Sequence, residues 1–271
     1  MMSSLKRVPA LSILLAFAAL VCLVIMVFGD ALSGHDHRAM NLDLRLAPPL
    51  TGGHLLGTDE LGRDVLARLL TGLRWSVATA LSATFIAFVI GTTFGLVAAR
   101  GQSALGGVMR LLTTFTQAFP PFVLAVTVIA VMGDAGFFSI VLTLGLVTWP
   151  VFSRVVYAEA RSLFEREHVL AAEMTGMPAI RLFVRHVLPG LIPSLSVLVV
   201  FHFADMIVAE SALSFLGIGA PLGAATWGAM LSESRGYMLS APWLTLSPAL
   251  AMVAIIVCAH ALGQHLRNAN R

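Results

Sequence analysis

Long apolar runs alternate with shorter polar segments along the chain, and their lengths predict membrane-spanning helices. A helix needs about twenty predominantly apolar residues to cross the hydrocarbon core of a bilayer. Six runs meet this length, at residues 8–29, 75–99, 111–133, 135–153, 188–211 and 243–263. The pattern therefore predicts an all-α membrane protein with about six transmembrane helices.

The first apolar run follows Lys6 and Arg7, an arrangement that is also found in secretory signal peptides. The run is longer than a typical signal-peptide core, and the residues after it form only a weak cleavage site. We expect a retained transmembrane helix.

The polar segments divide the chain into four parts. These are an N-terminal region with the first helix, an extracytoplasmic segment, a core of five helices and a short cytoplasmic tail, at residues 1–29, 30–74, 75–263 and 264–271. Within the second part, residues 57–64 are predicted to open a short amphipathic helix on the outer face, with Leu61, Val65, Leu66 and Leu69 as its apolar stripe. Thr58 would cap it, and Asp59/Arg63 would form an i,i+4 pair, as would Asp64/Arg68.

A charged segment at about residues 158–190 separates the fourth and fifth apolar runs, and its composition predicts a helix–turn–helix. Residues 165–174 favour a helix, which Gly176 would end in the left-handed conformation. Pro178 suits the first turn of a second helix, and Pro189 would close it. Such local order in a loop indicates a docking surface for another protein.

Composition supports a lipid environment. The chain is 58% hydrophobic and 11% charged, with a mean hydropathy of +0.90, whereas soluble domains carry about a quarter charged residues. With the N-terminus in the cytoplasm, eleven of the 17 Lys and Arg residues fall on the cytoplasmic side, namely Lys6, Arg7, Arg100, Arg110, Arg154, Arg161, Arg166, Arg181, Arg185, Arg267 and Arg271. This bias follows the positive-inside rule and explains the net charge of +3. It gives no reason to expect nucleic acid as a partner.

Five residues inside the apolar runs are candidates for a translocation pathway. Pro120 and Pro121 interrupt the third run, where they would cause either a packing kink or a bend beside the pathway. His202, Asp205 and Glu210 place ionisable groups in the fifth run. His202 and Asp205 would either bond to each other or line the pathway. For Glu210 we favour a structural hydrogen bond.

Other polar side chains give weaker signals. His35 and His37 flank Asp36 in the outer segment, where metal capture is possible, although a solvated loop is the favoured interpretation. Cys22 and Cys258 both fall in apolar runs and are interpreted as packing residues. We assign no metal site and no catalytic residues.

Four ordered motifs then resemble a known family. Ala171, Ala172 and Gly176 have the spacing A-A-x-x-x-G, and the sequence HVLP follows at residues 186–189. This pattern resembles the coupling loop of ABC-importer permeases, in the branch for dipeptides, oligopeptides and nickel. Leu170 stands where many members have glutamate. Further matches to the C-type permease of that branch lie at residues 56–64, 209–219 and 227–231.

The resemblance implies a bacterial inner-membrane permease subunit with both termini in the cytoplasm. It would form half of a pathway for di- or oligopeptides. Its partners would be a second permease, two ATPase subunits and an extracytoplasmic solute-binding protein. ATP and Mg²⁺ would bind to the ATPases, because this chain lacks a G-x-x-x-x-G-K-[ST] phosphate loop and has no cofactor of its own. The residues expected to couple to the ATPases are Glu167, Ala171, Ala172, Gly176 and Arg181.

Other functions explain less of the sequence. The same machinery carrying nickel or a metal chelate is the nearest alternative. An ion-coupled secondary transporter would use His202, Asp205 and Glu210, but the sequence has no evident inverted repeat and the charged segment would have no role. A membrane scaffold would not need buried acids. No triad or zinc signature indicates an enzyme.

Overall fold

The computed structural model describes residues 33–100, 104–133, 136–221 and 223–269. The first predicted span, residues 8–29, lies outside these ranges. The described residues form α-helices joined by turns, with three short η elements of 3₁₀ or π type. In chain order the elements are η1 (Leu42–Leu44), α2 (Val65–Ala99), α3 (Ala104–Gln117), α4 (Pro121–Met132), α5 (Phe137–Phe164), α6 (Glu167–Met174), α7 (Ala179–Leu182), η2 (Phe183–Val187), α8 (Leu188–Phe215), α9 (Trp227–Ser234), η3 (Arg235–Tyr237) and α10 (Trp243–Ala269).

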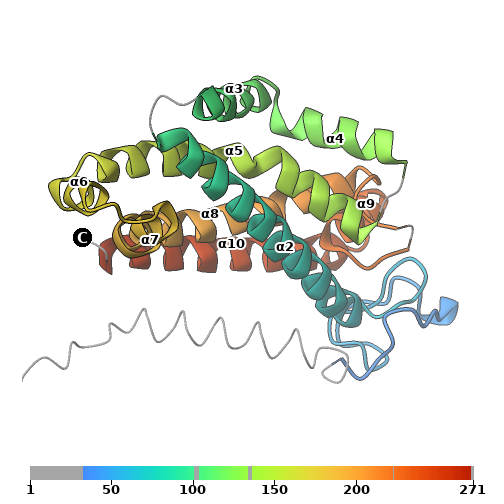
Figure 1. Ribbon diagram of the computed structural model, residues 1–271. Helices are drawn as coiled ribbons and strands as arrows, with labels where there is room; N and C mark the ends of the chain where they lie inside the picture. Colours follow the sequence, from blue (N-terminus) through green and yellow to red (C-terminus); the bar gives the residue numbers. More distant parts are fainter. Residues whose placement is uncertain (1–32, 101–103, 134–135, 222, 270–271) are drawn as a thin grey trace, which may run out of the picture.

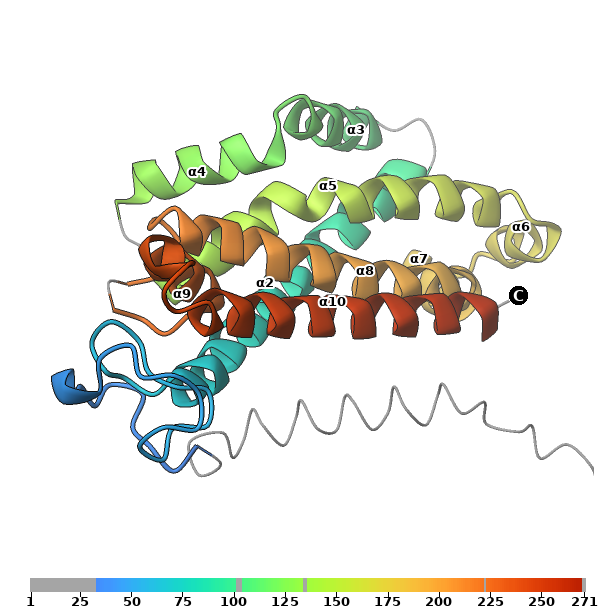
Figure 2. The same ribbon diagram turned by 180° about the vertical axis from the view of Figure 1, so that it is seen from behind.

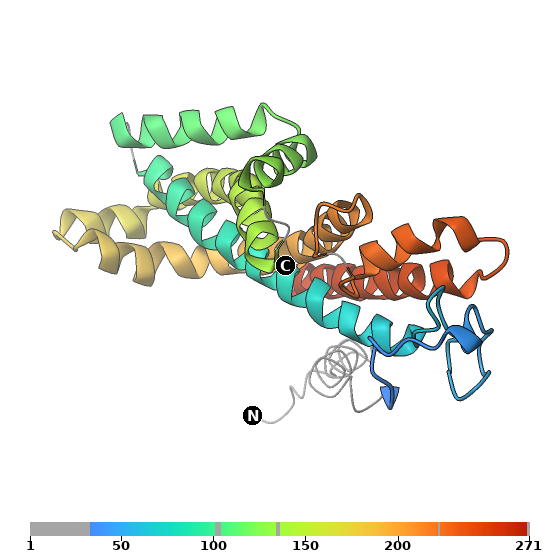
Figure 3. The same ribbon diagram turned by 90° about the vertical axis from the view of Figure 1, so that its right-hand side faces the viewer.

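Long helices pack into a bundle with distinct ends. Helices α5, α8 and α10 run side by side, and α2 crosses them obliquely (Figures 1 and 2). Helices α3 and α4 lie along the side of α5 (Figures 1 and 3). The short helices α6 and α7 lie at one end of the bundle, together with the end of α10. Helix α9 and the segment 33–64 lie at the opposite end (Figure 1).

The membrane-spanning character predicted from the sequence is confirmed. Helices α2, α5 and α10, and α8 together with the turns before it, are long and apolar enough to cross a bilayer, and the pair α3–α4 is a possible fifth span. At about 1.5 Å per residue, the 35 residues of α2 exceed the roughly 30 Å hydrocarbon thickness. Residues 65–74, which we had placed in the extracytoplasmic segment, are the first three turns of this helix.

The third predicted span is a broken helix. Helices α3 and α4 meet at a bend of 91°. Pro120 is the N-cap of α4, with φ −58° and ψ 123°, and Pro121 is its first residue. Neither proline has an N–H for a continuing helix, and a residue before proline avoids helical angles. The two prolines therefore account for the break that the sequence predicted.

The predicted short amphipathic helix does not open within residues 57–64, and only its later residues, from Val65 on, are helical. Gly57 and Gly62 both adopt positive φ, at 75° and 71°. A side chain at Gly62 would overlap the backbone of Asn41, so only glycine fits at this position. Helix α2 begins at Val65 instead, and Asp64, rather than Thr58, caps it by accepting a hydrogen bond from the Ala67 N–H at 2.6 Å.

Glycines allow α2 and α5 to approach closely. An added Cβ at Gly91 would lie 2.3 Å from the Trp149 carbonyl oxygen and 2.5 Å from the Phe152 Cβ. One turn later, a Cβ at Gly95 would lie 2.5 Å from the Ser153 carbonyl oxygen. Small residues at this spacing are typical of membrane helices in backbone contact. The crossing fixes how the rest of the bundle is placed.

We predict that Gly91→Ala destabilises the protein by about 1–3 kcal/mol, because the methyl group would force backbone or core atoms to move. The measurement is the midpoint of thermal unfolding of the purified protein in detergent. The control is Gly107→Ala in α3, where the nearest atom to an added Cβ is the Arg110 Nη2 at 3.9 Å. Alanine there is expected to be neutral or stabilising, since its helix propensity exceeds that of glycine. Equal midpoints for both variants would contradict the packing argument.

Candidate functional site

A helical hairpin stands at the end of the bundle where α10 ends. Helix α6 ends at Met174, and Gly176 follows in the left-handed conformation with φ 78°. The Thr175 and Gly176 N–H groups donate to carbonyl oxygens of the last turn, at 3.2 and 2.9 Å. The predicted helix end is confirmed. Pro178 is the N-cap of α7, one position before the helical turn in which we expected it.

The second half of the hairpin continues into α8 without a break. A π-helical turn, η2, joins α7 to α8, and the Leu188 N–H donates to the Phe183 carbonyl oxygen five residues before it. Pro189 is the second residue of α8 and does not close the hairpin, which corrects the prediction. Proline cannot donate to a carbonyl in the preceding turn and clashes with it in a regular helix, and the wider π turn gives the ring room.

Two buried side chains anchor the hairpin to the bundle. Val169 of α6 and Leu182 of α7 are fully buried in an apolar cluster with Phe152, Val187 and Leu191. These contacts join both hairpin helices to α5 and α8. The hairpin is therefore packed against these two long helices.

The residues predicted to couple to ATPases lie on this hairpin. Glu167, Ala171, Gly176 and Arg181 are exposed, whereas Ala172 is half-buried against the apolar cluster. Four of the five predicted coupling residues are thus exposed on the hairpin. Ala172 instead faces the bundle.

Sequence reasoning missed the two most prominent side chains of the hairpin. Met174 is 89% exposed and Ile180 is 80% exposed, on either side of the Gly176 turn. Large apolar side chains in a polar segment are a signal that could have identified them, because exposed apolar groups outside the membrane mark contact sites.

Glu210 is held by hydroxyl groups inside the bundle. Its carboxylate accepts hydrogen bonds from Ser76 of α2 and Ser214 of α8, both at 2.8 Å, and from Ser211 at 3.4 Å. The residue is fully buried. This arrangement joins α2 to α8 and has the geometry of the structural hydrogen bond that we favoured for Glu210.

His202 and Asp205 do not form a pair. His202 is buried between α8 and α2, with its Nδ1 3.2 Å from the Thr84 Oγ1 and its ring 4.9 Å from the Phe152 ring. Asp205 is exposed on α8, on the side where it interacts electrostatically with His260 of α10. Positions i and i+3 differ by about 60° around a helix, enough to separate an inner from an outer face.

The two prolines lie away from these residues. Pro120 and Pro121 are exposed at the bend between α3 and α4, on the outer side of α5. His202 lies in the interior between α2 and α8. Within the described residues, the five pathway candidates therefore occupy three different environments and do not converge on one site.

Buried charges organise the opposite end of the bundle. Asp59 accepts hydrogen bonds from the Arg63 Nε at 2.6 Å and from Arg68 of α2. Glu233 of α9 accepts from Arg68 at 2.7 Å and from Arg63 at 3.4 Å. Glu60 contacts Arg63 at 3.2 Å. The network joins the loop 57–64 to α2 and α9.

The network differs from the pairing that the sequence predicted. The i,i+4 pair Asp59/Arg63 forms, although in a loop and not in a helix. The second predicted pair does not form, because Arg68 turns to Asp59 and Asp64 pairs with the His54 Nδ1 at 2.7 Å. His54 lies ten residues before Asp64, outside the i,i+4 spacing, and Glu233 lies more than 160 residues from its partners, so the spacing rule could not reveal either contact.

The sequence matches a known protein family. Residues 91–271 match the family described as the binding-protein-dependent transport system inner membrane component. The chain belongs to this family. It is an ABC-importer permease of the peptide and nickel type.

Curated relatives of the permease cover most of its length. It is 31% identical to a dipeptide transport system permease protein, DppC, of Alkalihalophilus pseudofirmus, over 91% of this chain and 81% of the relative. It is 33% identical to the glutathione transport system permease protein GsiD of Pectobacterium atrosepticum, over 83% and 74%. It is 32% identical to the nickel transport system permease protein NikC of Escherichia coli, over 86% and 84%.

The fold matches a solved structure as well. A chain of the MetNI methionine ABC transporter, in an inward-facing conformation, superposes with a TM-score of 0.61. The match covers 75% of the permease and 96% of that chain, at 18% identity. This likeness concerns the fold alone.

We predict that Asp205→Asn lowers solute uptake, because Asp205 is the pathway candidate of α8 whose carboxylate is exposed. The free energy of unfolding should change by less than about 0.5 kcal/mol, because an exposed side chain contributes little to stability.

Glu210→Ala should instead lower the free energy of unfolding by about 1–3 kcal/mol, because three buried hydroxyl groups lose their acceptor. Uptake by reconstituted protein and thermal unfolding in detergent measure the two effects. A destabilised Asp205→Asn variant would contradict the placement of Asp205.

Proposed function

We propose that the permease forms half of the translocation pathway of a binding-protein-dependent ABC importer for di- or oligopeptides, and couples to ATPase subunits through the segment 158–190. The observation that carries this proposal is the hairpin α6–α7. It presents Met174 and Ile180 to solvent while Val169 and Leu182 anchor it in the bundle. A hairpin with an exposed apolar tip and a buried root suits the transmission of movement from a docked protein.

The chemistry of the hairpin surface fits contact without catalysis. Ala171 and Gly176 leave space for another backbone to approach, and an added Cβ at Gly176 would meet no atom within 4 Å. Glu167 and Arg181 offer opposite charges beside the apolar tip. ATP hydrolysis then belongs to the partner subunits, and the hairpin converts their closure into tilting of α5 and α8.

Peptide is the cargo we propose. Two of the relatives compared above carry dipeptide or glutathione in their names, and one carries nickel. Glutathione is itself a short peptide, so the peptide names agree on a class of cargo. Nickel, free or chelated, is the second candidate.

The coupling proposal predicts that Met174→Glu and Ile180→Glu each reduce co-purification of P-loop ATPases with the tagged permease by about tenfold or more, since a buried apolar contact would be replaced by a charge. The measurement is a pull-down from membranes in mild detergent with quantification of bound ATPase. Both side chains are exposed, so the fold is expected to survive.

The matched control is Leu42→Glu, which places the same charge on an exposed leucine at the other end of the bundle. It should retain the ATPases. Undiminished ATPase recovery with both hairpin variants would contradict the coupling role. A permease that purifies alone and transports solute without ATP would exclude the importer and favour a secondary transporter.

Cargo is tested separately. Proteoliposomes with the assembled importer and its binding protein should take up radiolabelled dipeptides in an ATP-dependent manner, and excess unlabelled dipeptide should abolish the uptake. Radiolabelled nickel is the comparison. ATP-dependent nickel uptake without peptide uptake would refute the peptide proposal and leave the coupling proposal intact.

A further inference from the structure

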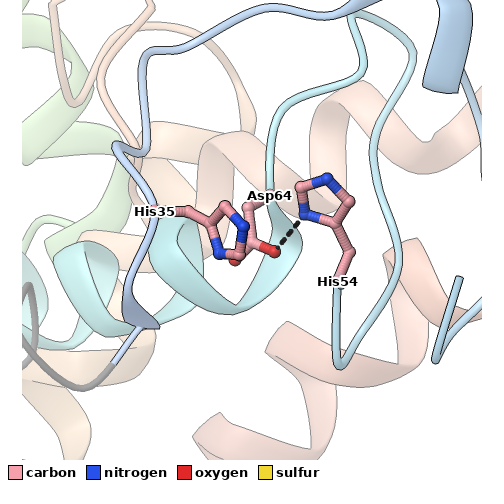
Figure 4. A group of neighbouring side chains, drawn as sticks. All are labelled: His35, His54 and Asp64. Carbon is pink, nitrogen blue, oxygen red and sulfur yellow. Dashed lines mark hydrogen bonds and ion pairs between the residues drawn. The ribbon is translucent and has the colours of Figure 1, made fainter. Parts of the chain in front are cut away.

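Three potential metal ligands meet beside the start of α2. His35, His54 and Asp64 each offer one ligand atom, and these atoms all lie within 4.8 Å of one another. The rings of His35 and His54 are 4.7 Å apart between centroids, at an angle of 37°. Figure 4 shows Asp64 beside the two rings, with a nitrogen of His54 turned toward the carboxylate oxygen that it pairs with. The three residues come from three separate parts of the outer segment.

Hydrogen bonds prepare His35 as a ligand. Its Nδ1 lies 3.1 Å from the Ser33 carbonyl oxygen. A carbonyl oxygen can only accept, so the Nδ1 carries the proton and the Nε2 keeps a free lone pair. Histidines that bind metals usually donate their other ring N–H to a carbonyl or a carboxylate in this way. His35 is exposed, so its Nε2 can be reached from solvent.

His54 and Asp64 form the buried side of the group. The His54 Nδ1 lies 2.7 Å from the Asp64 Oδ2, and both side chains are largely shielded from solvent. The other carboxylate oxygen of Asp64, Oδ1, caps α2 at the Ala67 N–H. The cap fixes the orientation of the carboxylate, so that Oδ2 points toward the histidines. A bound ion would take the place of the proton between His54 and Asp64.

The donor set selects a class of ion. Two imidazole nitrogens and one carboxylate oxygen suit Zn²⁺, and imidazole also suits Ni²⁺ and Cu²⁺. Mg²⁺ and Ca²⁺ prefer sites built from oxygen ligands alone. Three protein ligands leave a coordination position for water or an exogenous group. The positive end of α2 disfavours a cation, and the charge of Asp64 opposes this effect.

We propose that His35, His54 and Asp64 bind one divalent transition-metal ion of the Zn²⁺ or Ni²⁺ type. The ion joins the beginning of the outer segment to the first turn of α2. This site replaces the His35/His37 cluster considered from the sequence, because His37 instead lies 3.5 Å from Asp36. It also revises the expectation that the chain has no metal site. The inference does not depend on which solute the importer carries.

The test uses the full-length permease with its co-purifying partners, isolated through a tag without histidine and stripped with a chelator. Zinc is titrated, unbound metal is removed by gel filtration, and bound zinc is measured by mass spectrometry. We expect the native protein to retain one more zinc ion per chain than His35→Ala, and the variant to bind that ion at least about tenfold more weakly. Zinc should also raise the thermal unfolding midpoint of the native protein and not that of the variant.

Two further variants separate metal binding from folding. Asp64→Asn keeps an oxygen that can cap α2 and removes the carboxylate ligand, since asparagine caps helices as well as aspartate does. It should lose the zinc-dependent stabilisation while unfolding at the native midpoint without metal. His37→Ala is the matched control, an adjacent histidine outside the group, and should bind zinc as the native protein does. Equal zinc retention by the native protein and His35→Ala, or none by either, would overturn the proposal.

Discussion

The close crossing of α2 and α5 is the constraint on which the bundle depends. In lipid, apolar side chains gain nothing by leaving the solvent, so that helices associate through close packing and hydrogen bonds. Gly91 and Gly95 of α2 bring its backbone against α5, and Gly145 of α5 leaves room for Ile86 in return. Buried alanines at 80, 83 and 87 continue the contact along α2. Because α8 also packs on α2, the crossing helps to position α5 and α8, the two long helices against which the hairpin α6–α7 packs.

The two ends of the bundle are built on different principles. At the end that carries the segment 33–64, Arg63 and Arg68 share Asp59 and Glu233, and breaking such a buried network leaves charges without partners, which typically costs about 3–5 kcal/mol. At the other end, the hairpin α6–α7 depends on the burial of Val169 and Leu182. Apolar contacts of this kind have no preferred direction, and they permit small rearrangements that a charge network resists. We therefore expect the end with the charge network to be the stiffer of the two.

Sequence predicted what depends on composition and local geometry. Span positions followed from the length of the apolar runs, the break in the third span from Pro120 and Pro121, and the turn in the hairpin from Gly176. The helix start predicted within residues 57–64 was wrong for two reasons. An i,i+4 charge pair can also form across a loop, as Asp59 and Arg63 do, and Gly57 and Gly62 adopt positive φ, which a right-handed helix does not allow. His54 contacts Asp64 across a loop, ten residues further along the chain, and Glu233 contacts Arg68 across 165 residues. No spacing rule could reveal them.

Helical phase explains the polar residues of α8. His202 and Glu210 are eight residues apart and return to nearly the same face, where Thr84 and Ser76 of α2 meet them. Both side chains therefore make their polar contacts with α2 of the same subunit. Asp205 points elsewhere, onto the exposed surface that α8 shares with His260 of α10. An ionisable side chain facing hydrocarbon is costly, so that in the membrane this surface must meet water or another protein. The pathway proposed between two permease subunits would provide both, and under that proposal Asp205, rather than the buried His202, would be the residue of α8 nearer to the solute.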